Sequence, residues 1–519
     1  MKNGMKKSRE RKSLKFALLA MAACLAFTGC TGSGLPVKEE DNTQKTSVAA
    51  LALEGEKAEE KTEEVVLQEE TDKGSDREKG KLRSVSALEY MNYNISAFQT
   101  EEGYYSAEIL KSKEMYGDQA VCHQLVYTDF ATRQKKVLCT KDGCSHDNVE
   151  CSAYFESVMG PSRIFEAGGK IVVIRPYEER YSSLVSEDAE YPEPVLEEVY
   201  PGSVSVMDMD GGNARVIKDS IKDFESFWLT DDSYIYGTRY DVEEIAAEEG
   251  VEGSMSYEER TKGYLISINL ETGETKDLMD LPSVECFPVG ELDGDILMLD
   301  TVYPEDIPKD NWEERYEGST STYIKVDTET GKSETVASGL SRFFQVGRYA
   351  GDGEVYFSRG NPLDGAADKV GIYKVNLKTL EEELVFRGDE NCLYGIESMN
   401  DEEMILWYEE YESLYNEKGQ LSWIDIGLEK EIESYGYVRV DRKTGEQQKA
   451  SLLLEYEIKY GEETEINREF VMPLADAGDY YLVDCSAAMD GILILKQQAL
   501  ILKTDFWAGN ANYIPVTVV

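Results

Sequence analysis

Histidine is almost missing from this sequence, because His123 and His146 are the only two among 519 residues. Nucleophilic catalysis by Ser or Cys usually needs a His base, so this shortage argues against hydrolases of that kind. The sequence also lacks a Gly-x-Ser-x-Gly nucleophile elbow, a Walker-type phosphate loop and a Gly-x-Gly-x-x-Gly dinucleotide motif. We therefore assign no catalytic residue from the sequence.

Basic residues are also scarce, since 54 Lys and Arg stand against 102 Asp and Glu and the formal net charge is −48. Proteins grip a phosphate backbone with clustered Lys and Arg, so this composition argues against nucleic acid as a partner. Hydrophobic residues nevertheless make up 41% of the chain and aromatic residues 10%. Most of the chain is therefore expected to fold around a core.

The apolar run at residues 16–27 is too short for a transmembrane helix, because twelve residues rise about 18 Å against a hydrocarbon core of about 30 Å. Seven basic residues precede it, which is typical of a bacterial export signal. The run ends in Phe-Thr-Gly-Cys30, which resembles a lipobox. We predict that residues 1–29 are a signal peptide and that diacylated Cys30 anchors the protein outside the cytoplasm, on the cell membrane. An ordinary signal peptide with an incidental Cys is the alternative.

Aromatic residues are absent from residues 31–83, where Glu, Lys, Ser, Thr and Gly dominate. Such a composition cannot bury a core, so residues 30–89 are predicted to form a flexible tether. A short charged helix is the alternative, because Glu, Lys and Ala are good helix formers. Either form spaces a folded body, residues 90–519, from the membrane. Because the protein has no basic patch, its attachment should depend on the acyl chains alone.

Helical periodicity is rare after residue 90, and short runs of Tyr, Val and Ile bounded by Asp, Gly and Asn recur instead. One unit repeats: an alternating apolar strand, a turn ending in Gly or Thr-Gly, and a shorter strand, as at residues 264–273 and 323–331. A strand pair around an acidic tight turn precedes most of these units, as at residues 227–236 and 292–299. Two strand pairs joined by a long loop are typical of a β-propeller blade, so we predict an all-β fold.

The turn residues that mark this repeat lie 49 to 79 residues apart, and residues 91–519 divide into seven units of about 61. The markers are Thr132, Gly211, Thr272, Thr330, Thr379 and Thr444. We predict a single β-propeller with about seven four-stranded blades; six or eight would also fit, and an array of β-sandwiches is the alternative fold. Strands near residues 95–98 and 513–516 should help to close the ring, because closure removes exposed sheet edges.

The turn at residues 207–215, Met-Asp-Met-Asp-Gly-Gly-Asn-Ala-Arg, resembles those that end the blades of TolB-type β-propellers. The sequence is more similar still to uncharacterised propeller-like lipoproteins of clostridial gut bacteria. In these a lipobox, an acidic tether and a Cys/His-rich first blade occur together. The resemblance covers residues 90–519 and implies the fold but no known activity.

Four of the nine cysteines and both histidines fall between residues 122 and 151. Cys139, Cys144, His146 and Cys151 have the spacing Cys-x4-Cys-x-His-x4-Cys, and three thiolates with one imidazole form a plausible tetrahedral set for structural zinc. One or two disulfides are the main alternative outside the cytoplasm, and free thiols are the third. No other cofactor is expected. Three cysteines scattered along the body are expected to be buried core thiols: Cys286, Cys392 and Cys485.

Acidic residues concentrate in four long insertions between the strand pairs of the repeat, at residues 178–203, 241–262, 303–320 and 409–433. These insertions hold 30 acidic and seven basic residues, and they should emerge on one face because they occupy the same slot of the repeat. Carboxylates beside rings suit neutral glycans or cationic peptides. Solvated loops that keep an acidic protein soluble would show the same composition. The rings expected to contact a ligand are Trp312, Tyr316, Tyr411 and Trp423.

These observations predict a non-catalytic lipoprotein of the cell surface that binds or scaffolds a neutral or cationic ligand, either a glycan or a peptide. A glycan-processing enzyme with paired carboxylates is the alternative, since 102 acidic residues offer many pairs. A sensor or an assembly partner within an envelope machine is a third interpretation.

Overall fold

The structure is a computed structural model of the whole chain, and it describes most of the body and a short segment before it. The described residues are 81–85, 97–111, 121–157, 163–182, 195–222, 224–245, 257–304, 306–308, 311–341, 344, 347–351, 353–359, 370–400, 402–411, 432–450, 452–460, 463–485, 487–489, 492–495 and 498–519. The predicted signal peptide, Cys30, the tether up to residue 80 and Trp423 lie outside them. No helix within the described part is long and apolar enough to cross a membrane.

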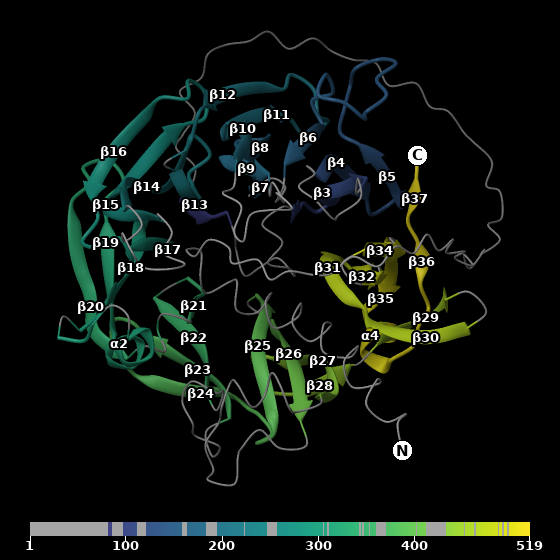
Figure 1. Ribbon diagram of the computed structural model, residues 1–519. Helices are drawn as coiled ribbons and strands as arrows, with labels where there is room; N and C mark the ends of the chain where they lie inside the picture. Colours follow the sequence, from purple (N-terminus) through teal and green to yellow (C-terminus); the bar gives the residue numbers. More distant parts are fainter. Residues whose placement is uncertain are drawn as a thin grey trace, which may run out of the picture.

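Seven antiparallel sheets are arranged around a common centre, as Figure 1 shows. The all-β, seven-bladed propeller predicted from the repeat is therefore confirmed, and the array of β-sandwiches is excluded. From the centre outward, blade 1 has β2 (Ala97–Gln99), β3 (Gly103–Lys111), β4 (Val121–Asp129) and β5 (Gln134–Val137), and blade 2 has β7 (Arg163–Ala167), β8 (Lys170–Arg175), β11 (Ser203–Asp208) and β12 (Arg215–Asp219). In the same order, blade 3 has β13 (Phe224–Thr230), β14 (Tyr234–Ile245), β15 (Tyr257–Asn269) and β16 (Thr275–Asp280), and blade 4 has β17 (Phe287–Leu292), β18 (Asp295–Val302), β19 (Thr320–Val326) and β20 (Ser333–Ser341). The strands of blades 5 to 7 are β21 (Arg348–Tyr349), β22 (Glu354–Arg359), β23 (Gly371–Asn376) and β24 (Glu382–Arg387); β25 (Cys392–Met399), β26 (Glu403–Tyr411), β27 (Ile432–Asp441) and β28 (Gln447–Ala450); β31 (Met472–Ala477), β32 (Tyr480–Asp484), β35 (Gln498–Leu502) and β36 (Ile514–Pro515).

The antiparallel order gives the ring two different ends. In every blade the first and second strands, and the third and fourth strands, are joined at one end, which we call the turn end. The second and third strands, and successive blades, are joined at the other end, which we call the insertion end. All four long insertions named from the sequence lie between second and third strands, and the described strands that flank them meet the insertions at the insertion end.

The Thr-Gly turns at the turn end follow from local hydrogen bonding. In blade 3, Asn269 Oδ1 accepts hydrogen bonds from the backbone N–H groups of Glu271 and Thr272 at 2.9 and 2.8 Å. Gly273 follows with φ 73°, a left-handed conformation that favours glycine. Blade 4 repeats the arrangement around Asp327. These turns depend on neighbouring residues only, which is why the repeat was visible in the sequence.

In blades 2, 3 and 4, glycine in the turn between the third and fourth strands also lets the blade approach the previous one. A Cβ atom on Gly211, Gly273 or Gly331 would lie 2.2, 1.8 or 2.1 Å from a backbone carbonyl oxygen of the preceding blade. The three carbonyl groups belong to Leu138, Ile217 and Leu278. The turn of one blade therefore rests on the outer strand of the blade before it.

Replacing Gly273 by Ala is expected to destabilise the ring more than replacing Gly294 by Ala. Both residues have positive φ, so both variants carry a left-handed alanine that costs about 1 kcal/mol. A Cβ on Gly294 meets nothing within 4 Å, whereas one on Gly273 collides with the Ile217 carbonyl. Moving that backbone should add about 1–3 kcal/mol. Equal unfolding midpoints for the two variants in denaturant would show that this contact between blades is unimportant.

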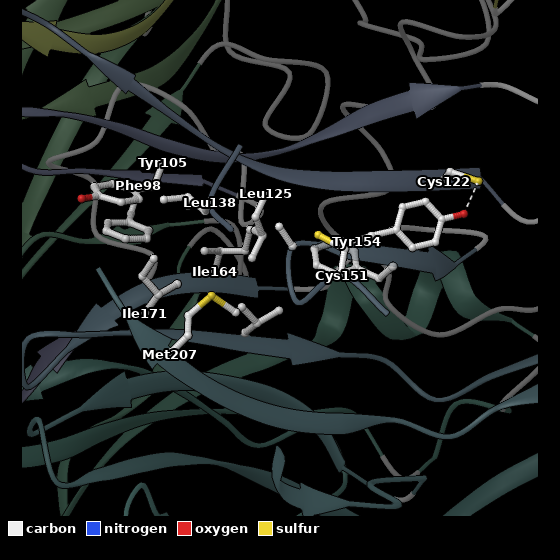
Figure 2. Packing of buried hydrophobic residues seen from close by; sticks show 13 residues of the cluster. Phe98, Tyr105, Cys122, Leu125, Leu138, Cys151, Tyr154, Ile164, Ile171 and Met207 are labelled. Atoms are coloured by element: carbon white, nitrogen blue, oxygen red, sulfur yellow. Dashed lines mark hydrogen bonds between the residues drawn. The ribbon is translucent and has the colours of Figure 1, made fainter. Parts of the chain in front are cut away.

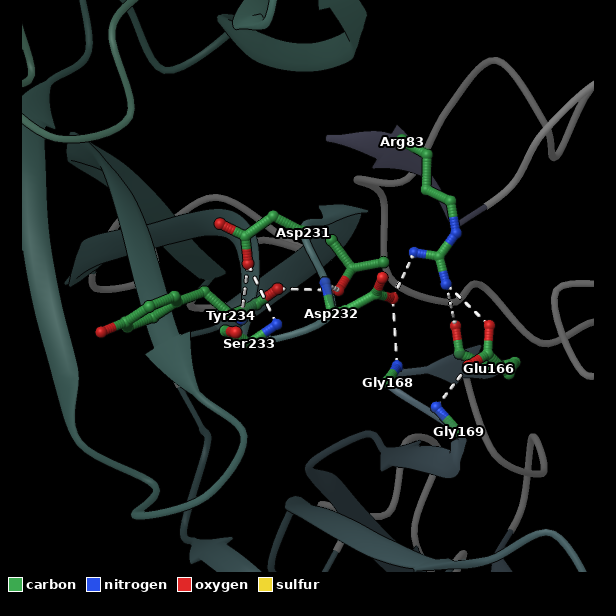
Figure 3. Close-up of polar contacts among 9 residues, drawn as sticks. Arg83, Glu166, Gly168, Gly169, Asp231, Asp232, Ser233 and Tyr234 are labelled. Carbon is green, nitrogen blue, oxygen red and sulfur yellow. Dashed lines mark hydrogen bonds and ion pairs between the residues drawn. The ribbon is translucent and has the colours of Figure 1, made fainter. Parts of the chain in front are cut away.

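The hydrophobic core lies mainly between neighbouring blades. Between blades 2 and 3, for example, Phe165 and Val172 pack with Ile235 and Ile266, all of them buried. At the same seam Figure 3 shows Arg83, which forms ion pairs with Glu166 and Asp232 at 2.8 Å each. Arg83 belongs to β1 (Arg83–Ser84), which pairs with the innermost strand of blade 3.

Strand β1 shows where the N-terminal segment enters the ring. Arg83 pairs with Thr230 beside the turn between β13 and β14, and Ser84 pairs with Leu229, one residue farther from that turn. The chain therefore enters at the turn end and runs toward the insertion end. The composition of residues 31–83 does not reveal this strand.

The C-terminal segment closes the ring. Strand β36 is the outer strand of blade 7, and β37 (Thr517–Val518) then crosses to pair in parallel with β5 of blade 1. A polar network reinforces the same joint, in which Lys135 Nζ and Gln498 Nε2 both donate to Glu108 at 3.0 Å. The expected segment 513–516 takes part in closure, whereas residues 97–98 of the expected N-terminal strand form the inner strand of blade 1.

Candidate metal centre and ligand-facing end

The Cys/His cluster occupies an interruption in the outer strand of blade 1. Strand β4 pairs with β5 over residues 126–128 and with β6 (Tyr154–Ser157) over residues 121–124. Leu138 and Ala153 flank the interruption, and both hydrogen-bond the backbone of Leu125. Residues 138–153 therefore form a loop that leaves the sheet and returns to it along the same edge.

Tight turns within this loop aim the four side chains at one point. Cys144 N–H donates to the Lys141 carbonyl and Cys151 N–H to the Asn148 carbonyl, so each cysteine ends a turn. Gly143 and His146 have positive φ of 68° and 57°. Gln124 Nε2 of β4 donates to the His146 carbonyl at 2.9 Å and ties the loop to the sheet.

The ligand atoms lie close enough together to surround one metal ion. One atom from each of Cys139, Cys144, His146 and Cys151 lies within 4.8 Å of all the others. His146 Nδ1 lies 3.5 Å from Cys151 Sγ, and a tetrahedral ion with bonds of about 2.0 Å to nitrogen and 2.3 Å to sulfur requires about 3.5 Å. The predicted convergence is confirmed, and the cluster can hold a metal ion such as zinc.

Burial and hydrogen bonding together shift the pKa values of Cys151 and Cys139 in opposite directions. Desolvation, together with hydrogen bonds in which Cys151 donates, raises the pKa of Cys151 to about 12. At Cys139 burial acts in the same direction, but hydrogen bonds from the Lys141 backbone and the other thiols outweigh it and lower the pKa. A divalent cation would stabilise the thiolate form of both groups, because metal binding displaces thiol protons.

The cluster sits at the joint between blades 1 and 2. Cys151 is 2% exposed and packs among core residues, as Figure 2 shows beside Ile164 and Met207. The backbone at Leu138 and Cys139 touches Gly211 of blade 2. Because the protein supplies all four ligands, a bound ion would have no open position for substrate, so the geometry suits a structural site.

The other cysteines of the described residues and the second histidine are buried. The described cysteines form no disulfide. Cys286, Cys392 and Cys485 are buried, as predicted, in three different cores between blades. His123 is also buried, and its ring stacks on Phe155 with centroids 6.5 Å apart. His123 therefore belongs to the core and His146 to the Cys/His cluster.

Of the four rings proposed as ligand contacts, the structure describes the side chains of Tyr316 and Tyr411 only, and these belong to blades 4 and 6. Tyr316 is partly buried on α2 (Trp312–Gly318), in the connection between the second and third strands of blade 4. Trp312 begins the same helix, but its side chain lies outside the description. Tyr411 belongs to blade 6, is 3% exposed and donates to Glu409 Oε2 at 2.7 Å. The alternation of polar and apolar residues in the sequence did not predict that Tyr411 is buried.

Further secondary structure extends the insertion end. A two-stranded ribbon, β9 (Glu178–Ser182) with β10 (Val195–Tyr200), lies between the second and third strands of blade 2, and β33 (Ala487–Met489) with β34 (Ile492–Leu495) lies at the same place in blade 7. In blade 3 the pair β14 and β15 continues beyond its neighbours to Ile245 and Tyr257. The third-to-fourth strand turn of blade 7 is replaced by α4 (Lys503–Ala508), at the turn end.

Comparison with known proteins assigns this chain to no family. No family model matches the sequence, and no curated protein matches it significantly. Similar solved structures include dipeptidyl peptidase 4 of Porphyromonas gingivalis, at 11% identity and TM-score 0.36, covering 84% of this chain and 59% of that one. TolB of Acinetobacter baumannii has 10% identity, 79% coverage of each chain and TM-score 0.28. An oligogalacturonate lyase in complex with manganese has 12% identity, 66% and 81% coverage, and TM-score 0.32. The chain thus spans 59% of the length of the peptidase, and it resembles these proteins only distantly.

Proposed function

We propose that this protein is a lipid-anchored surface lipoprotein whose propeller binds or scaffolds a neutral or cationic glycan or peptide at its insertion end. The observation that carries the proposal is the separation of the two ends. The N-terminal segment enters at the turn end through β1 and the ion pairs of Arg83. The insertions lie at the opposite end. An anchor at Cys30 would therefore hold the body by its turn end and leave the insertion end free for a ligand.

The tether is long enough to allow this arrangement. About fifty residues separate Cys30 from Arg83, and a flexible chain of that length has an end-to-end distance of about 40 Å. The bilayer would then not block access to the body. With no basic patch available, diacylation is the proposed source of membrane affinity.

Charge determines the class of ligand in this proposal. The four insertions contain 30 acidic residues and seven basic ones. An anionic polymer would be repelled from such a rim, whereas a cationic peptide would be attracted over about a Debye length, 8 Å at physiological salt. A neutral glycan would instead bind by stacking on rings and hydrogen-bonding to carboxylates.

For the cluster at Cys139, Cys144, His146 and Cys151 we propose structural zinc. Three thiolates and one imidazole match its preferred ligands. The ion would fasten the loop 138–153 against the turn of blade 2 that contains Gly211. In this role it supports the ring and takes no part in ligand binding.

A glycan and peptide array at low and high salt tests the proposed ligand site. The Cys30→Ala variant should leave the membrane fraction of its host and supply soluble protein for the array. Capture of basic peptides that weakens with salt would indicate electrostatic recognition, and salt-insensitive capture of neutral glycans would indicate ring stacking. Replacing Trp312 by Ala and the exposed Glu314 by Gln should reduce capture, whereas Glu271→Gln with Glu329→Gln at the turn end should not. Tight binding of acidic polysaccharide that survives the first pair of changes would contradict the proposal.

One observation favours the second candidate, a glycan-processing enzyme. On blade 6, burial raises the pKa of Glu397, although the charge of Arg348 opposes it, and burial likewise raises the pKa of Glu409. A carboxyl group whose pKa is raised is better suited to act as a general acid. Release of shorter oligosaccharides from arrayed glycans, lost in a Glu397→Gln variant, would support this alternative.

A further inference from the structure

A short strand inside blade 3 carries an inference that is independent of the insertions and of the metal cluster. Among the described strands, β1 is the only one that lies inside the first strand of a blade. It pairs with β13 through Arg83 opposite Thr230 and Ser84 opposite Leu229, and it also contacts β17, the first strand of blade 4. Residues 82–85 therefore lie on the inner edge of the ring in the way that an added peptide strand lies on the edge of a sheet.

Three side chains of this segment are held by blades 2, 3 and 4. Leu82 is 5% exposed and packs in the core between blades 3 and 4. Val85 packs against the core between blades 2 and 3. Between them, Arg83 donates to the carboxylate and to the backbone carbonyl of Glu166 in blade 2, at 2.8 Å each, and forms an ion pair with Asp232 of blade 3. The ring thus contacts an extended segment through the pattern Leu-Arg-x-Val.

The two carboxylates that bind Arg83 are oriented by the ring itself. Gly169 N–H donates to Glu166 Oε1 at 2.7 Å, and Gly168 N–H donates to Asp232 Oδ1 at 3.0 Å, as Figure 3 shows. Both glycines belong to the turn between β7 and β8. We call Glu166 and Asp232 the acidic pair. Without a cation between them these carboxylates would repel each other, so the inner edge favours a positively charged side chain at this place.

The contacts that hold the segment are few and partly exposed. Its ladder with β13 has two residue pairs. The side chains of Arg83, Glu166 and Asp232 are 38%, 34% and 37% exposed, and ion pairs that water can reach hold a segment weakly. The covalent link compensates for this weakness, because residues 85–96 join β1 to β2 and so short a link gives an effective concentration on the order of 1 mM.

We propose that this inner edge is a second peptide-binding site, in which residues 82–85 are an internal ligand that an extended Leu-Arg-x-Val segment of a partner protein can displace. The partner segment would add a strand to β13, place its arginine between the two carboxylates of the acidic pair, and bury its leucine between blades 3 and 4. A segment with an acidic residue in place of the arginine would be repelled, so charge selects the partner. The site lies at the turn end, and it is therefore separate from the ligand site proposed at the insertion end.

Binding of a fluorescent synthetic peptide with the sequence of residues 80–87 to the full chain carrying Cys30→Ala tests the proposal. Adding Arg83→Glu to the chain should release the internal segment, because a third carboxylate would then face the acidic pair. Loss of this competitor should tighten peptide binding about tenfold or more. The matched control, Lys81→Glu, makes the same change of charge at an exposed neighbouring residue and should alter the peptide affinity less than about twofold. A peptide with Glu in place of its arginine should bind none of these chains.

A second variant and the unfolding midpoints keep the test decisive if Arg83→Glu weakens the ring. Leu82→Asp releases the segment through a different contact and should tighten peptide binding in the same way. The peptide should raise the midpoint of both release variants and change that of Lys81→Glu little. Equal peptide affinity of the unchanged chain and the release variants would overturn the proposal, as would equal binding of the peptide that carries Glu. Trp312→Ala with Glu314→Gln should leave peptide binding unchanged, because these residues belong to the opposite end of the ring.

Discussion

Removing the proposed zinc is expected to cause a large loss of stability. Protein purified without reductant or chelator should contain about one zinc per chain. Chelation should lower the unfolding midpoint, and added zinc should restore it. At free zinc 1,000-fold above the dissociation constant, the stabilisation amounts to about 4 kcal/mol. The physical reason is that a bound ion would join four residues of a loop that otherwise depends on a few turns and on Gln124.

Substitution of the ligands distinguishes stabilisation by the metal from stabilisation by ordinary packing. Cys144→Ser should abolish zinc binding and the response to chelator, because a hydroxyl group does not replace a thiolate ligand. The change should disturb packing little, because the Cys144 side chain is partly exposed and serine fills nearly the same space. Cys485→Ala is the matched control, since this thiol is 5% exposed in the core of blades 6 and 7. It should lower the midpoint through lost packing yet keep the zinc and the chelator response. Protein without zinc but with disulfides among Cys139, Cys144 and Cys151 would contradict the metal assignment.

Deleting residues 513–519 is expected to open the ring and destabilise all seven blades. The deletion removes β36 and β37, and with them the bonds from Val516, Thr517 and Val519 N–H to the carbonyl groups of Gln498, Arg133 and Lys135. At about 1 kcal/mol per hydrogen bond, with the buried contacts of Ile514 and Val516 in addition, the loss should be about 4–6 kcal/mol. Exposed edges on blades 1 and 7 should also promote association.

A control variant separates the effect of losing the closing strand from the effect of changing its side chains. Val518 and Val519 are 72% and 65% exposed, so replacing both by Ser should change the unfolding free energy by less than about 0.5 kcal/mol. Thermal and denaturant unfolding of the two variants, with size-exclusion chromatography, measures the contrast. If the truncated protein keeps the midpoint of the full chain, the polar network at Glu108 suffices for closure and the strand does not stabilise the ring.

The repeat could be predicted because its signals are local. The side chain of Asn269 or Asp327 folds back on its own backbone, and Gly273 and Gly331 supply the left-handed residue that follows. Such turns form from four to six neighbouring residues, so they have the same sequence signature in each blade. The metal cluster was visible for the same reason, since its ligands lie within thirteen residues and are brought together by turns inside that segment.

The contacts that join distant segments could not be predicted, because any free strand edge can accept any extended segment of suitable length. Local patterns along the chain were enough to predict the all-β class, the blade repeat and the composition of the Cys/His cluster. The folded ring was needed to show that β37 pairs with β5 nearly four hundred residues earlier, that Arg83 enters blade 3 at the turn end, and that Tyr411 is buried against Glu409.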